Sequence, residues 1–153
     1  MTPEAFQGLL AGITATLAGR PLDATLEELL NSRFPAGGDV VQGIVQACGE
    51  AMTEGWMCKY EGGGIRYGRV IKPSPDTQGF SVDVVDMKPI AGPRHTHPKG
   101  EIDLIMPRAA GAQFDGRGAG WLVYEPGTAH RPTVTGGRAW ILYLLPEGEI
   151  VFS

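Results

Sequence analysis

The sequence predicts an α+β protein that is mainly β, with a helical segment at residues 1–60 and a β-sandwich, jelly roll or barrel at residues 61–153. Apolar residues recur at helical spacing in the first third of the chain, whereas from Ile65 onward the apolar period shortens to two. The chain has 153 residues, the length of one ordinary domain. We therefore expect the helices to pack on the β-structure as part of one structural domain.

Three helices are expected before residue 60. The first begins near Pro3 and ends at residues 19–21, which have the sequence Gly-Arg-Pro. The second begins with a capping box, in which Thr25 is followed three residues later by Glu28, and Pro35 ends it. Asp39 caps the third. The apolar stripes are Phe6, Leu9, Leu10, Ile13 and Leu17 in the first helix, Leu26, Leu29 and Leu30 in the second, and Val41, Ile44, Val45, Cys48 and Met52 in the third.

Short strands are expected over the rest of the chain. Apolar residues alternate with polar neighbours at residues 65–67 and 80–84. Further apolar runs at 101–106, 121–124, 139–145 and 149–152 are separated by clusters of Gly, Pro, Asp and Thr. Many short strands with turn signals between them are typical of a sandwich, jelly roll or barrel.

Composition and charge limit the classes of function. The chain is 42% hydrophobic and 20% charged, which is typical of a globular protein. Its net charge of −4 provides no positive surplus to neutralise phosphates, so nucleic-acid binding as the main role and binding to acidic lipid surfaces are both disfavoured. The longest apolar runs are far shorter than the ~20 residues of a membrane span.

The N-terminal sequence and the cysteines predict the compartment. The first ten residues, MTPEAFQGLL, lack the basic and long apolar regions of a secretory signal, so we expect a cytoplasmic protein. Cys48 and Cys58 are too few for a disulfide framework and are expected to be buried thiols.

The three histidines of the chain fall in two short segments. In GPRHTHPKGE, His95 and His97 are two residues apart, so an extended backbone projects both imidazoles from one strand face. Glu101 follows a turn-prone Pro-Lys-Gly and opens the next strand, where its carboxylate can return to the same metal. In GWLVYEPGTAH, a strand runs into a Pro-Gly turn and delivers His130 as the fourth ligand.

This set of side chains predicts a catalytic metal centre. Three imidazoles and one carboxylate suit Fe, Mn, Ni, Co or Zn as a divalent ion, and they leave one or two positions open for water or substrate. Glu101 is instead a general base if the histidines hold the metal alone. Asp103 shares the strand face of Glu101 and is either a partner of a ligand histidine or an acid–base group.

These residues resemble the two motifs of the cupin superfamily. The first motif, a glycine before HxHxxxE, is met by Gly92, His95, His97 and Glu101. The second normally has the pattern PxGxxH, but here only Gly127 and His130 match and the proline is displaced by one residue, which predicts a slightly altered turn. The resemblance implies a double-stranded β-helix, or jelly-roll barrel, with a metal inside and a homodimer as the expected assembly. Cupins include dioxygenases, isomerases, lyases and storage proteins, so the fold alone does not fix the function.

A longer stretch is similar to one bacterial family. The segments HTHPKGEIDLIMP and FDGRGAGWLVYEPGTAHRPTVTGGRAWILYLLPEGEI resemble small cupin-like 4-hydroxylaminobenzoate lyases of nitroaromatic degradation. The resemblance implies conversion of 4-hydroxylaminobenzoate to 3,4-dihydroxybenzoate (protocatechuate) with release of ammonia. The absence of a GxGxxG segment before a helix agrees with a reaction that uses no nicotinamide.

An aromatic acid substrate needs a cation for its carboxylate. Arg94 and Arg131, each adjacent to a ligand histidine, are the candidates, although strand alternation would turn both outward as solvated or inter-subunit arginines. Tyr67 and Tyr124 are the candidate aromatic contacts of the substrate. They belong to a set of expected barrel-lining aromatic residues that also includes Trp121, Trp140 and Tyr143.

Two alternative functions use the same residues. Another metal-dependent cupin enzyme, a dioxygenase or an isomerase, would need the same four ligands. A non-catalytic cupin that binds a small molecule is the third hypothesis, although the helical segment carries no convincing DNA-reading helix to act as an effector. Oxygen dependence separates the lyase, which needs no oxygen, from a dioxygenase.

Overall fold

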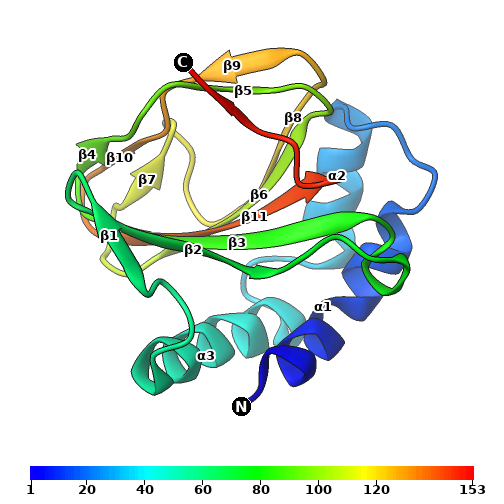
Figure 1. The fold of residues 1–153 in the computed structure, drawn as a ribbon, viewed down its shortest axis with the longest axis horizontal. Coiled ribbons are helices and arrows are strands. Elements are labelled where there is room, and N and C mark those ends of the chain that lie inside the picture. The colour runs from blue at the N-terminus through cyan, green and yellow to red at the C-terminus, as the bar shows by residue number, and fades with distance from the viewer.

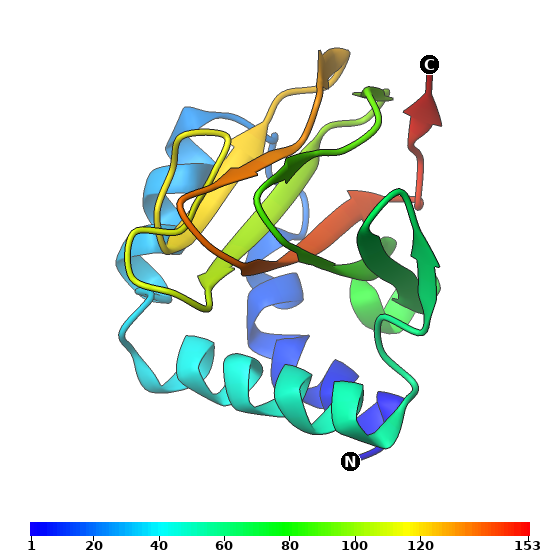
Figure 2. The ribbon, with the colours of Figure 1, turned by 90° about the vertical axis from the view of Figure 1, so that its left-hand side faces the viewer.

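The computed structural model describes residues 1–153, with three helices followed by many short strands (Figure 1). The helices are α1 (Pro3–Leu17), α2 (Ala24–Arg33) and α3 (Asp39–Glu54), and the first strand begins at Tyr60. In Figures 1 and 2, α1 and α3 lie below the β-structure, while α2 runs along one of its sides. The predicted fold class, mainly β with helices at the N-terminal end, is confirmed. None of the helices is long and apolar enough to cross a membrane.

The helix caps differ from those predicted. Asp23 is the N-cap of α2, and its carboxylate accepts a hydrogen bond from the backbone N–H of Leu26 at 3.0 Å. Thr25 therefore lies inside the helix, and its predicted capping box with Glu28 is wrong. Gly38 is the N-cap of α3 without a side-chain bond. The prediction that Asp39 caps α3 is also wrong, because Asp39 lies in the first turn of the helix. Its negative charge there interacts favourably with the positive end of the helix dipole.

The buried helix faces are narrower than the predicted stripes. Leu9 is exposed, and Val45 and Met52 are only partly buried. Two small residues of α3, Ala47 and Ala51, are buried instead, as expected where another helix packs closely. The periodicity of large apolar residues does not reveal such positions, because alanine carries little hydrophobic signal.

The strands form one large and two small sheets. The large sheet has the order β1 (Tyr60–Gly62), β2 (Ile65–Ile71), β3 (Phe80–Met87), β11 (Ala139–Pro146), β6 (Glu101–Pro107) and β8 (Gly120–Tyr124). One small sheet contains β4 (Ile90–Ala91), β10 (Thr133–Thr135) and β7 (Gln113–Phe114). The other contains β12 (Val151–Phe152), β5 (His95–His97) and β9 (Thr128–His130). A short 3-10 helix, η1 (Pro75–Thr77), joins β2 to β3. All strand pairs are antiparallel, and Figure 2 shows the small sheets curling over the large one.

The two faces of the large sheet belong to two separate hydrophobic cores. Alternate residues of β3, β6 and β11, such as Val84, Leu104 and Leu142, pack with the helices. Their neighbours Val85, Ile105 and Ile141 point the other way and pack with the small sheets inside the barrel. β3 is therefore buried on both faces rather than alternately exposed.

Helix α2 also closes the outer edge of β8. The Asn31 side chain donates to the backbone oxygen of Trp121 at 3.0 Å and accepts from its N–H at 2.9 Å. One oxygen of Glu27 accepts from the N–H of Val123 at 2.9 Å. These side chains replace a neighbouring strand, so the edge beside the candidate site is not free to pair with another chain.

Candidate metal centre and adjacent cavity

His95 and His97 lie on the same face of β5, as their spacing predicted. The strand ends in a tight turn in which the N–H of Gly100 donates to the carbonyl of His97 at 3.2 Å. Gly100 has a φ of 89°, and a Cβ there would lie 2.7 Å from the Tyr124 carbonyl oxygen. A glycine is therefore required at this turn, which brings Glu101 to the start of β6 beside the histidines.

His130 completes the cluster from β9, which pairs with β5 so that His130 stands opposite His95. The Nε2 atoms of His95, His97 and His130 lie 3.4, 3.3 and 3.5 Å from the nearest Glu101 oxygens. All four potential ligand atoms lie within 4.8 Å of one another. The structure thus brings together the four side chains that the sequence predicted as ligands.

The chemistry of this cluster fits a divalent cation. Both Glu101 oxygens and His97 Nε2 are buried without a hydrogen-bond partner. Burial raises the pKa of the Glu101 carboxyl, but the surrounding imidazoles outweigh it and hold that pKa well below its ordinary value. A buried carboxylate facing imidazole nitrogens is costly unless a cation satisfies it.

Two outer partners orient the imidazoles. The Thr128 hydroxyl donates to the Glu125 carbonyl at 2.6 Å, so it accepts from His97 Nδ1–H at 3.0 Å. The Asp115 carboxylate accepts from His130 Nδ1–H at 2.6 Å. Both bonds leave the Nε2 lone pair facing the centre of the cluster, which is the tautomer that a metal requires.

Sequence reasoning missed Asp115. Its carboxylate also accepts from the Tyr124 hydroxyl and, at 2.9 Å, from the Thr133 N–H. Burial raises its pKa, but these donors and His130 outweigh burial, so the net pKa of Asp115 is lowered. The residue lies in the loop after β7 with a φ of 50°, next to glycines that the sequence assigns to turns. Its only sequence signal is an Asp-Gly pair, which also predicts an ordinary turn.

Asp103 follows Glu101 on the same face of β6. It is fully buried, and neither carboxylate oxygen has a hydrogen-bond partner. The prediction that it shares a face with Glu101 is confirmed, but it makes no hydrogen bond to a histidine. Burial, and then the Glu101 charge, raise the pKa of Asp103 well above its ordinary value.

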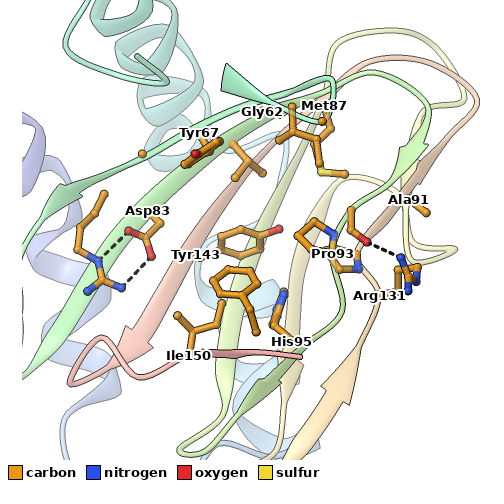
Figure 3. A pocket seen from close by; sticks show the side chains of 18 residues that line it. Gly62, Tyr67, Asp83, Met87, Ala91, Pro93, His95, Arg131, Tyr143 and Ile150 are labelled. Carbon is orange, nitrogen blue, oxygen red and sulfur yellow. Dashed lines mark hydrogen bonds and ion pairs between the residues drawn. The ribbon is translucent and has the colours of Figure 1, made fainter. Parts of the chain in front are cut away.

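A cavity of about 820 Å³ opens beside the cluster (Figure 3). His95 lines it, whereas His97, Glu101 and His130 do not. Its walls include apolar side chains from β2, β3 and β12, among them Ile65, Val85, Met87 and Phe152. The Phe152 ring lies 5.6 Å from the His95 ring, measured between centroids. The cavity has room for an aromatic ring next to the cluster.

The predicted substrate contacts divide into two groups. Arg131 and Tyr67 line the cavity, whereas Arg94 and Tyr124 do not. Arg94 is exposed and donates to the Ser153 hydroxyl at 3.1 Å. Tyr124 instead lies against the cluster, with its ring centroid 4.5 Å from that of His130.

The structure adds one ion pair that the sequence did not predict. Arg69 and Asp83 line the cavity from adjacent strands, joined by two hydrogen bonds of 2.9 and 3.2 Å. The pairing across strands depends on the register of β2 and β3, which sequence spacing does not reveal.

The jelly-roll sheets and the cluster of three histidines and one glutamate together define a cupin. A solved oxalate oxidase structure is 22% identical, covering 60% of this chain and 56% of that one with a TM-score of 0.47. The sequence model of the 4-hydroxylaminobenzoate lyase family (PnbB) matches residues 9–152, and the chain belongs to this family.

Two relatives have the same description. The 4-hydroxylaminobenzoate lyase of Nocardioides sp. (strain LMS-CY) is 30% identical over 146 residues, covering 90% of this chain and 86% of that protein. The 4-hydroxylaminobenzoate lyase of Pseudomonas putida is 28% identical over 163 residues, covering 95% of this chain and 93% of that protein. The predicted family is confirmed, and the chain is a lyase that acts on a small molecule.

Proposed function

We propose that this enzyme converts 4-hydroxylaminobenzoate to 3,4-dihydroxybenzoate and ammonia, with one divalent metal ion held by His95, His97, Glu101 and His130. The observation that carries the proposal is the convergence of these four ligands beside a cavity into which His95 opens. The two relatives named as lyases of this substrate support the choice of reactant.

The proposed reaction is balanced without another reagent. Cleavage of the N–O bond releases one water, reduces the nitrogen and oxidises the ring by the same two electrons. One water then adds at the ring carbon beside the carbon that bears nitrogen, and a second hydrolyses the resulting imine to release ammonia. Substrate plus one net water therefore contains the same atoms as the two products, and no oxygen or nicotinamide is consumed.

The protein supplies the metal ligands and the groups that orient them for this chemistry. A bound cation would act as a Lewis acid on the hydroxylamino oxygen and ease its departure. Thr128 and Asp115 hold His97 and His130 in the required tautomer. Asp103 is the remaining acid–base group of the proposal, because its buried carboxyl group has no hydrogen-bond partner within the protein.

Arg131 is the proposed partner of the substrate carboxylate. Arg131 lines the cavity, and its guanidinium donates one hydrogen bond within the protein, to the Gly92 carbonyl oxygen at 3.3 Å, and makes no ion pair. Arg69 also lines the cavity, but Asp83 already neutralises it. Arg131 is exposed, as strand alternation predicted, but it still lines the cavity.

The proposal is tested by anaerobic turnover. Purified protein incubated with 4-hydroxylaminobenzoate should release ammonia and 3,4-dihydroxybenzoate in equal amounts, and a chelator should stop both. His97→Ala should lose bound metal and turnover together. Unchanged metal content and rate in this variant would show that the ligands are wrong, and strict dependence on oxygen would indicate a dioxygenase.

The carboxylate assignment is tested by a pair of arginine variants. Arg131→Ala should raise KM about 10- to 100-fold, because it removes a charge-assisted hydrogen bond worth about 1.5–3 kcal/mol. Arg94→Ala, which changes an exposed arginine outside the cavity, should leave KM unchanged. The assignment fails if the two variants have the same KM.

A further inference from the structure

Tyr143 is a polar side chain of the cavity that is not a ligand of the proposed metal site and has no role in the proposed function so far. It lies on β11, is only 6% exposed and lines the cavity together with His95. In Figure 3 its ring lies centrally among the cavity residues, between Met87 and His95. The register places it directly between Asp83 on β3 and Asp103 on β6. Asp103 is two residues from Glu101, so Tyr143 lies on the strand next to the one that carries Glu101.

The Tyr143 hydroxyl makes no hydrogen bond within the protein, although two carboxylates are its neighbours in the sheet. Both oxygens of Asp83 are bound to Arg69, and both oxygens of Asp103 lack a partner. The hydroxyl of Tyr124, in contrast, donates to Asp115. A phenylalanine would fill the space of Tyr143 without placing an unpaired polar atom beside an apolar wall, so packing does not explain the hydroxyl.

The hydroxyl of Tyr143 is suited to act as a donor. Burial, and then the surrounding carboxylates, raise the pKa of Tyr143 well above its ordinary value, so the phenol keeps its proton. Tyr67, the other tyrosine of the cavity, is 44% exposed and lies on β2, farther from the cluster in the strand order. Tyr143 is thus the buried phenol donor of the cavity.

We infer that the Tyr143 hydroxyl donates a hydrogen bond to the oxygen of the hydroxylamino group when the substrate is bound beside His95. This inference rests on the proposed function and adds a residue that recognises the reacting group. Tyr143 would then select for ligands that carry an oxygen atom at this position, while Arg131 holds the opposite end. The bond also strengthens as negative charge develops on the departing oxygen, so it favours N–O cleavage.

The selectivity can be measured with two stable probes. In 4-(hydroxymethyl)benzoate a CH₂ group replaces the N–H of the substrate and the oxygen is retained, whereas 4-ethylbenzoate has a methyl group in place of that oxygen. Tyr143→Phe should weaken binding of 4-(hydroxymethyl)benzoate about 3- to 10-fold, as expected for one neutral hydrogen bond. Binding of 4-ethylbenzoate should not change. Tyr60→Phe, which removes a hydroxyl from a 53% exposed tyrosine outside the cavity, is the matched control and should change neither affinity.

Turnover gives a second readout. Tyr143→Phe should lower kcat for 4-hydroxylaminobenzoate by about 10-fold or more, with metal content unchanged. Its melting temperature should stay the same, because the hydroxyl faces the cavity and makes no hydrogen bond within the protein. A clear fall in stability, equal weakening of both probes or an unchanged kcat would overturn the inference. The proposed function fails separately, if the wild-type protein releases no ammonia from 4-hydroxylaminobenzoate.

Discussion

The two faces of the six-stranded sheet are both buried, but they differ in chemistry. The face toward the helices consists of apolar side chains from β3, β6, β8 and β11 that join a core with α1, α2 and α3. The face toward the barrel interior carries Glu101, Asp103, Asp83 and Tyr143 among its apolar residues. The same strands supply both faces, because alternate residues point in opposite directions.

The comparison separates residues that stabilise the fold from residues that perform chemistry. On the helix-covered face most side chains are apolar, and the buried exception, Asp86, forms an ion pair with Arg138 at 3.1 Å. On the interior face several buried polar atoms have no partner within the protein, and such atoms reduce stability unless a ligand binds them. The polar groups of the interior face therefore serve ligand binding rather than the stability of the free protein. Substitutions on the interior face should mainly weaken binding, whereas substitutions on the helix-covered face should mainly lower stability.

The largest effect is expected at Glu101. Glu101→Gln retains the shape of the side chain but removes its charge, so metal affinity should fall by more than about 100-fold, beyond the loss of an outer partner. The stability of the metal-free protein should change little, because the cost of burying the carboxylate and its attraction to the imidazoles are lost together. Metal titration and urea unfolding in the presence of chelator measure the two effects. A metal-free variant much less stable than wild type would contradict the comparison.

Leu104→Ala tests the opposite face of the same strand. Leu104 is completely buried in the core shared with the helices, so its truncation should lower the free energy of unfolding by about 2–5 kcal/mol. Metal affinity of the folded protein should remain within about twofold of wild type, because Leu104 points away from the cluster. A large loss of metal affinity under folding conditions would mean that the two faces are coupled.

Substitution of Asp115 should weaken metal binding less than Glu101→Gln does. Asp115→Asn weakens the bond that holds His130 in its tautomer, so metal affinity should fall about 10- to 100-fold. Asp76→Asn, at an exposed aspartate of η1, removes the same charge far from the cluster and is the control. Equal affinities in the two variants would show that Asp115 does not support the histidine.

The sequence predicted the parts of the site that are local along the chain. His95, His97 and Glu101 are separated by a single turn, so strand alternation and one glycine bring them together. Asp115 and Tyr143 come from other strands and loops, and their positions depend on the register of the sheets. No pattern within one segment encodes that register, which explains why Asp115 was missed and Tyr143 was predicted only as a barrel-lining aromatic residue.

The same distinction applies to the fold. Helix positions and the longer strands follow from apolar periodicity, and these predictions are confirmed. The expected strand at 149–152 shortens to Val151–Phe152. The two-residue strands β4 and β7 were not predicted, because they are shorter than one period of any pattern and form only through pairing with β10.

The smallest expected effect concerns Cys48, which tests whether the helix-covered core excludes ionised groups. Burial raises the pKa of Cys48 from 9.0 to about 12, with a further increase from Cys58. The unfolded chain releases this proton above pH 9 whereas the folded protein retains it, so stability is fully present below pH 9 and decreases as the pH rises toward 12. From pH 9 upward, Cys48 should contribute a loss approaching about 1.4 kcal/mol per pH unit.

Urea unfolding at pH 8, 9 and 10 measures this loss. Cys48→Ala should show a shallower decline in stability with pH than the wild-type protein, whatever its stability at pH 8, because the only change that titrates in this range is the missing thiol. Parallel declines in the two proteins would mean that the Cys48 thiol ionises as easily in the folded protein as in the unfolded chain. The core against the helices would then admit water or charge, and the contrast between the two faces of the sheet would not hold at this position.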